Sequence, residues 1–146
     1  MMKLLKTLVA VSVAISSLPV FAHSIKMDVY IPTGVEVYAP MGRKLNAFNV
    51  HYVDGLKKQE EKVSQLLPKD PKAAEERLTS FIQSGEYKEY AQGLVDGWHT
   101  VNAVVNSGIK KVPAVVIDDH FVAYGVSPLE ALKYYDAYIV KYGIKK

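Results

Sequence analysis

Residues 111–130, KVPAVVIDDHFVAYGVSPLE, decide the fold of this chain. The unbroken apolar run Ala114–Ile117 is typical of a buried strand. Asp118-Asp119 predicts a tight turn, after which His120–Tyr124 returns as the second strand of a β-hairpin. Ser127–Glu130 places a serine at an N-cap, a proline at the first helical position and a glutamate at the third, which predicts a helix. A hairpin followed directly by a helix indicates an α/β domain.

The middle of the chain carries helical periodicity. Asp70-Pro71 supplies an N-cap acceptor and a proline at the first helical position, so we expect a helix to begin there. Gly85 interrupts this helix. The apolar residues from Tyr87 to Val105 then recur at helical spacing and predict a longer helix, which ends at Ser107-Gly108. The helix after the hairpin is expected to stop at Gly143.

Two further strands are expected before the helical middle. Gly34–Ala39 alternates in character, with its valines on one face, and is the first predicted strand. Asn49–Val53 is the second, closed by an Asp-Gly turn. Lys26–Ile31 also has β character, but Pro32 makes it an edge strand or a lead-in. The order of two strands, a helical middle, a hairpin and a helix predicts a small α/β domain.

The first residues are expected to form a cleavable signal peptide. Lys3 and Lys6 make a charged start, Leu8–Val20 is apolar, and Ala22 ends a stretch that suits a signal peptidase. The alternative is an uncleaved membrane anchor, but spanning a bilayer takes about 20 apolar residues and this run is shorter. We therefore expect residues 1–22 to be removed and residues 23–146 to form a single exported domain.

Composition excludes several classes of function. The chain is 49% hydrophobic and 23% charged, which is typical of a soluble globular domain. Without residues 1–22 its net charge is +1, so nothing electrostatic favours nucleic acid. There is no cysteine, which excludes disulfides, thiol nucleophiles, dithiol redox chemistry and cysteine-based zinc sites. Phosphate-binding and serine-hydrolase motifs are also absent, so we expect no enzymatic activity and no cofactor.

Several motifs resemble one group of proteins. They are the hairpin segments Lys111–Asp118 and Phe121–Val126, the Val-Glu-Val at residues 35–37, the Leu-Pro-Lys-Asp-Pro at residues 67–71, and the Gly-Leu-Val-Asp-Gly-Trp at residues 93–98. Over roughly Val35 to Leu132 the chain is similar to uncharacterised exported proteins encoded within integrating conjugative elements. The order of elements also resembles a thioredoxin-like fold. The resemblance implies a periplasmic, thioredoxin-like protein associated with DNA-transfer machinery, although thiol exchange needs two thiols that this chain lacks.

The resemblance also implies a binding site. In a thioredoxin-like fold the first strand runs into an active-site loop, here Ala39–Arg43, and a cis-proline, here Pro113, lies opposite it. The residue before a cis-proline exposes its backbone to an extended ligand. The partner-binding residues expected on this basis are Val112, Pro113, Tyr38, Met41 and Arg43. The alternative is that Pro113 is an ordinary trans proline before an edge strand. The function implied is a non-catalytic binding or assembly component whose partners are other proteins of the transfer apparatus.

The competing hypothesis is a periplasmic metal-dependent enzyme or metal-binding protein. After cleavage, His23 would carry the terminal amine, which together with imidazoles could chelate copper. The available partners are His51, His99 and His120. These histidines lie on separate predicted elements without ligand spacing, so no metal site is expected.

Tyrosines suggest a second partner site. All ten lie after residue 22, and four crowd the last helix. Tyr135 and Tyr142 are expected on its inner face, whereas Tyr134 and Tyr138 are one turn apart and form a possible interaction surface. The alternative is that both are ordinary surface residues.

Two glycines stand inside the long predicted helix. Gly93 and Gly97 would each cost about 1 kcal/mol relative to alanine there, so a packing reason is expected. We expect close packing of this helix on the sheet, with Trp98 filling the adjacent space. The alternative is contact with a partner helix.

Overall fold

The computed structural model describes residues 24–143, so the predicted signal peptide and His23 lie outside the described residues. Within them the elements follow the order β1 (Ile25–Ile31), β2 (Leu45–Tyr52), α1 (Gly55–Leu66), α2 (Pro71–Ile82), α3 (Gly85–Ser107), β3 (Ala114–Ile117), β4 (Phe121–Tyr124) and α4 (Pro128–Tyr142). No helix in this part of the chain is long and apolar enough to cross a membrane.

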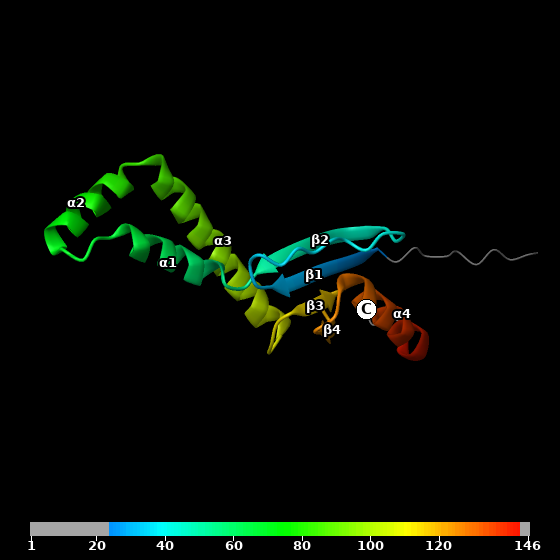
Figure 1. The fold of residues 1–146 in the computed structure, drawn as a ribbon. Coiled ribbons are helices and arrows are strands. Elements are labelled where there is room, and N and C mark those ends of the chain that lie inside the picture. Colours follow the sequence, from blue (N-terminus) through cyan, green and yellow to red (C-terminus); the bar gives the residue numbers. More distant parts are fainter. Residues whose placement is uncertain (1–23, 144–146) are drawn as a thin grey trace, which may run out of the picture.

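The four strands form one mixed sheet in the order β2-β1-β3-β4 (Figure 1). β1 runs parallel to β2 and antiparallel to β3, and β3 and β4 form the predicted hairpin. Asp118 and Asp119 have φ values of 51° and 60° in its turn, a left-handed conformation that aspartate tolerates. The protein is thus a mixed α/β domain, and its topology is compatible with a thioredoxin-like fold.

The prediction for the strands before the helical middle was wrong in part. Ile25–Ile31, expected at an edge, is a central strand and is almost entirely buried, because Pro32 lies just beyond it and interrupts no ladder. Gly34–Ala39 is not a strand; it belongs to an irregular, largely exposed connection between β1 and β2. The second strand is longer than expected and spans Leu45–Tyr52.

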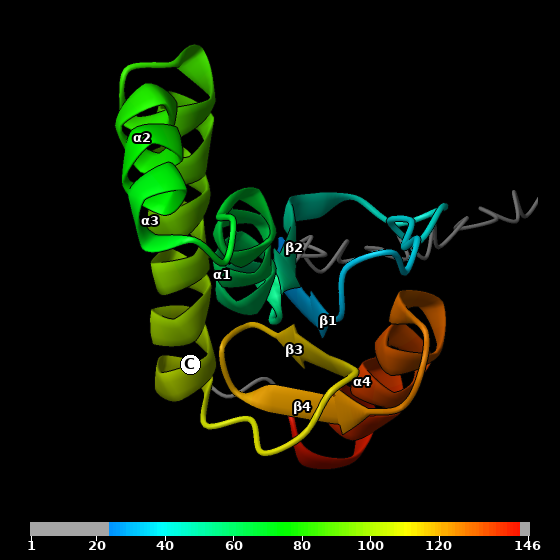
Figure 2. The same ribbon diagram turned by 60° about the vertical axis from the view of Figure 1, so that its left-hand side comes forward.

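Alternation along β1 separates two layers. Ile25, Met27, Val29 and Ile31 pack in one core with the buried face of α4. On the opposite face Tyr30 packs in a second core near the C-terminal end of α3. Figure 2 shows α3 and α4 on opposite sides of the sheet.

The helical middle projects from the sheet as an arm, with α2 farthest from the strands (Figure 1). The predicted cap at Asp70 is present, because its carboxylate accepts a hydrogen bond from the Ala73 N–H at 2.9 Å. α3 ends at Gly108, whose φ of 65° is the left-handed conformation that glycine favours. The helix α1 was not predicted.

The packing predicted for the glycines of α3 was wrong. They face α1 and not the sheet: a Cβ at Gly97 would meet Leu56, and one at Gly93 would meet Gln59. Trp98 fills no space beside them, since 59% of its surface is exposed.

α4 carries the predicted capping box between Ser127 and Glu130. Its tyrosines are arranged differently from the prediction. Tyr135 is fully buried as expected, but Tyr142 is exposed. Tyr138, expected on an outer face, packs against the core, which leaves Tyr134 as the exposed member of the predicted pair.

Candidate functional site: an apolar groove beside Pro113

The β1–β2 connection covers its part of the sheet without a helix. Parallel neighbouring strands need a crossover connection, which is usually a helix that covers the sheet. Here residues 32–44 make that connection without a helix. At this place an irregular segment and the start of α4, and no crossover helix, cover the sheet face that carries Val29, Ile31 and Val115.

A groove of about 880 Å³ opens at this place. Val29, Ile31 and Val115 form its floor, residues 35–41 form one wall, and Pro113 together with residues 125–129 forms the other. Most of these side chains are apolar. Several stand exposed on the rim, namely Val35, Tyr38, Met41 and Leu129.

Three of the predicted binding residues meet in this groove: Tyr38, Met41 and Pro113. Met41 is 94% exposed and Tyr38 is 75% exposed, both unusually high for large apolar side chains. The Tyr38 hydroxyl donates a hydrogen bond of 2.6 Å to Glu36. This hydrogen bond to the Glu36 carboxylate raises the pKa of Tyr38 above its ordinary value. The peptide bond between Val112 and Pro113 is cis.

Val112 is not in the groove. It is part of the lining of a neighbouring hollow beside α3, on the other side of the Val112–Pro113 bond. Pro113 is held in place because its carbonyl accepts a hydrogen bond of 3.0 Å from the Gly125 N–H, which joins the two ends of the hairpin. Val112 and Pro113 are therefore adjacent in sequence but line two different surfaces.

Arg43 also lies outside the groove lining. Its guanidinium forms an ion pair with Asp136 on α4. This contact ties the β1–β2 connection to α4 from outside, so Arg43 fixes the wall of the groove and does not line it. Tyr134 and Tyr138, on the same helix as Asp136, do not line it either.

Sequence reasoning missed the wall formed by the β4–α4 junction. Residues 125–129 enter the groove, and Leu129, in the first turn of α4, is 47% exposed there. Ser127 is engaged in the capping box and has no free hydroxyl chemistry to offer. The sequence offered one signal for the groove: residues 32–44 contain two prolines and two glycines, which disfavour a crossover helix there.

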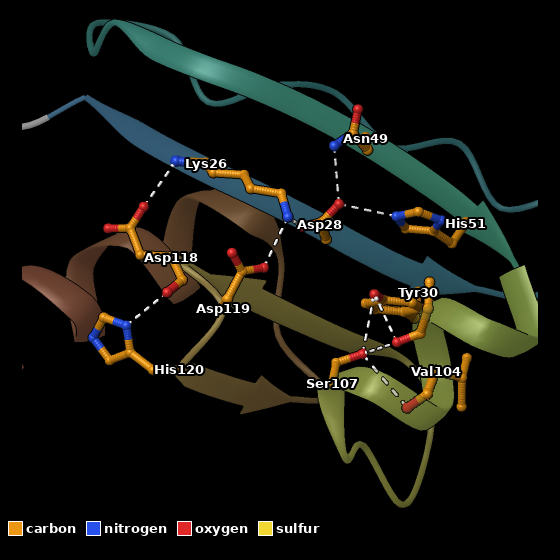
Figure 3. Close-up of polar contacts among 11 residues, drawn as sticks. Lys26, Asp28, Tyr30, Asn49, His51, Val104, Ser107, Asp118, Asp119 and His120 are labelled. Atoms are coloured by element: carbon orange, nitrogen blue, oxygen red, sulfur yellow. Dashed lines mark hydrogen bonds and ion pairs between the residues drawn. The ribbon is translucent and has the colours of Figure 1, made fainter. Parts of the chain in front are cut away.

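A polar cluster occupies the other face of the sheet (Figure 3). The buried Asp28 carboxylate accepts hydrogen bonds of 2.9 Å from both Asn49 and His51, and Lys26 lies 3.2 Å from its second oxygen. Burial raises the pKa of Asp28, but the hydrogen bonds from His51, Asn49 and Lys26 outweigh it and hold the pKa below the usual value. Lys26 also contacts Asp119 at 2.8 Å, and Asp119, followed by Asp28, raises the pKa of Lys26. The charges and hydrogen-bonding groups of this cluster pair with one another, so the cluster cross-links the strands.

The histidines of the described residues are dispersed. His51 is bound to Asp28 and stacks on Tyr30 with ring centroids 4.6 Å apart. His120 contacts the Asp118 backbone carbonyl at 2.7 Å, and His99 is exposed on α3. Among residues 24–143 there is no group of three or more histidine, aspartate or glutamate side chains that could hold a metal ion. The metal hypothesis also involves His23, which lies outside them.

Comparison with known proteins yields one match. Neither a curated protein nor a solved structure matches this chain. The family model described as "Protein of unknown function (DUF1525)" matches residues 28–141. Because this match covers most of the chain, including both walls of the groove, the protein belongs to the DUF1525 family.

Proposed function

We propose that this protein is a non-catalytic binding component that holds an apolar segment of a partner protein in the groove beside Pro113. The observation that carries the proposal is the apolar groove between residues 35–41 and 125–129, with the exposed side chains of Val35, Tyr38, Met41 and Leu129 on its rim. Exposed apolar surface of this kind marks interaction sites. Apolar side chains of a partner would cover these exposed rim residues.

The size of the groove supports a defined binding site. Its volume of about 880 Å³ lies within the range of roughly 300–1,000 Å³ that is typical of ligand sites in proteins. Its rim keeps Met41 and Leu129 exposed, and an interface core enriched in methionine and large apolar residues is typical of protein partners. Closing the groove with a partner would remove this apolar surface from water.

The polar groups in the groove support a function without catalysis. Glu36 accepts the Tyr38 hydrogen bond, and Ser127 caps α4. The chain has no cysteine, so the thiol exchange for which thioredoxin-like sites are known is not available to it. These groups therefore favour binding of a partner without a chemical step.

The biological setting rests on the sequence. The resemblance to exported proteins of integrating conjugative elements, together with the signal-peptide pattern of residues 1–22, supports a place in the periplasm. We propose that the partner is a protein of the conjugative transfer apparatus, that the chain contacts no nucleic acid directly, and that it is not stably inserted in a membrane once residues 1–22 are removed.

The test compares two matched variants on α4. Leu129→Glu places a charge in the groove, whereas Val140→Glu places the same charge on an exposed site of that helix outside the groove. We expect pull-downs from cells that carry the element to recover the same element-encoded protein with the unmodified chain and with Val140→Glu. Leu129→Glu should reduce that recovery by about tenfold or more, since burying an unpaired charge costs well over 1.4 kcal/mol. Equal recovery with Leu129→Glu would overturn the proposal.

A further inference from the structure

A second hollow lies between the end of α3 and the residues that follow β2. Its volume is about 310 Å³. Its apolar lining consists of Val53, Val101, Val104, Val105, Ile109 and Val112. The volume equals that of about ten water molecules, which is room for one or two large apolar side chains. No residue of the groove lines this hollow, so it is a separate surface.

Apolar side chains around this hollow are left exposed. Val105 is 71% exposed and Val112 is 39% exposed. Trp98 lies two turns before Val105 on the same flank of α3 and is 59% exposed. Val105 and Val112 line the hollow and Trp98 lies beyond its lining, and their exposed apolar surface is available for a partner to cover.

The charge around the hollow has one sign. Among residues 24–143, Lys110 and Lys111 are the charged residues that line it, and both are exposed. Within residues 24–143 neither lysine takes part in an ion pair, since every ion pair there involves other residues. Asp54, the acid next to Val53 in sequence, accepts hydrogen bonds of 2.8 and 2.6 Å from Thr33 and pairs with Lys58 at 3.7 Å instead of with either of these lysines.

The lysines are held at the rim by Tyr124 of β4. The Lys110 backbone N–H donates a hydrogen bond of 3.2 Å to the Tyr124 hydroxyl. The Lys111 ammonium lies 5.2 Å from the centre of the Tyr124 ring, a cation–π contact. Both positive charges therefore stand next to the apolar hollow in a fixed backbone segment.

We infer that this hollow binds an acidic, apolar segment of a partner protein. An apolar side chain enters between Val101, Val105 and Val112, and neighbouring carboxylates lie against Lys110 and Lys111. Complementary charge determines the specificity for the partner, and the apolar contact provides most of the affinity. This inference does not depend on the function proposed for the groove.

Trp98 provides the measurement, because it is the only tryptophan of the chain. The probe is an acetylated, amidated hexapeptide of alternating leucine and glutamate, titrated while tryptophan emission is recorded. We expect a saturable blue shift that weakens as salt is raised. The same peptide with lysine in place of glutamate should bind at least about fivefold more weakly. Equal affinity for both peptides would overturn the inference.

Variants separate this site from the groove. Lys110→Glu with Lys111→Glu should weaken binding of the leucine–glutamate peptide by at least about fivefold, since two surface ion pairs at ~0.5–1 kcal/mol each are replaced by repulsion. The matched control, Lys133→Glu with Lys141→Glu on α4, should leave it unchanged. Val105→Asp, at an exposed position that the fold does not need, should abolish it, whereas Leu129→Glu should have no effect. Peptide binding that survives the change at Lys110 and Lys111, or is lost with Leu129→Glu, would contradict the assignment.

Discussion

At the residue scale, Asp28 combines burial with charge. Its side chain is only 8% exposed, yet it carries a charge that Asn49, His51 and Lys26 compensate. A buried charge is tolerated only with such partners. The cluster links β1 to β2 on the sheet face opposite the groove, so it stabilises the strands on which the groove floor is built.

Replacing Asp28 should therefore destabilise the fold. We expect Asp28→Ala to lower the free energy of unfolding by about 2–3 kcal/mol, because the donors of Asn49 and His51 lose their acceptor. Urea denaturation measures the change. Asp96→Ala, at an exposed position on α3, is the control and should change stability by less than about 0.5 kcal/mol. An equally small effect of Asp28→Ala would show that the cluster does not support the sheet.

The same residue sets a pH dependence. The pKa of Asp28 lies below its ordinary value of 3.8 in the folded state, so its ionised form favours folding at higher pH, and this contribution is lost as pH falls through the folded pKa. The stability difference between the unmodified chain and Asp28→Asn should be constant from pH 7 to about pH 5 and shrink below about pH 4. Urea midpoints across this range measure it. A difference that grows on acidification would contradict the assigned direction.

Residue-scale features were predictable where they depend on near neighbours in sequence. The cap at Asp70 and the capping box at Ser127 and Glu130 involve residues within one turn, so their pattern was readable. The Asp28 cluster was not readable, because Asn49 and His51 reach Asp28 only through the pairing of two strands.

At the element scale, the arm depends on the contact between α1 and α3. A Cβ at Gly97 would lie 2.6 Å from a methyl carbon of Leu56 and 3.2 Å from the Leu56 backbone nitrogen. Gly93 faces only the end of the Gln59 side chain. The Gln59 carbonyl oxygen is buried and has no hydrogen-bond partner among the described residues.

Alanine should therefore act oppositely at the two glycines. Gly97→Ala should destabilise by about 1–2 kcal/mol, because the backbone of α1 would have to shift and this outweighs the helix propensity gained. Gly93→Ala should be neutral or stabilise by up to about 1 kcal/mol, because the flexible Gln59 side chain can move toward water. Thermal or urea unfolding distinguishes them. Equal stabilisation by both changes would show that α1 does not pack as closely as described.

The helices and strands differ in how strongly the sequence predicts them. The helices α2 and α4 begin with proline behind a capping residue and were predicted. The helix α1 has no side-chain cap and buries no residue, so it gives little signal. The alternation in residues 34–39 predicted a strand, but the valines of this segment lie along the groove wall. Alternation indicates which side chains share one face of the chain. It does not show whether the backbone pairs with another strand.

At the scale of the whole molecule, the fold class was predictable because the hairpin and the capped helix that follows it are local in sequence. The site was predictable only in part. Tyr38, Met41 and Pro113 meet in the groove, whereas Arg43 binds α4, Val112 faces the second hollow, and Tyr138 packs in the core. These differences depend on how α4 and the β1–β2 connection pack across the sheet, which no local pattern records.

Site-specific photo-cross-linking tests the central claim most directly. A photoreactive amino acid would replace Met41, Leu129 or, as the control on α4, Val140, in cells that carry the transfer element. We predict that positions 41 and 129, which line opposite walls, capture the same apolar segment of one partner protein and that position 140 captures none of it. Capture of that segment from position 140 alone, or no shared segment between positions 41 and 129, would contradict a partner seated in the groove.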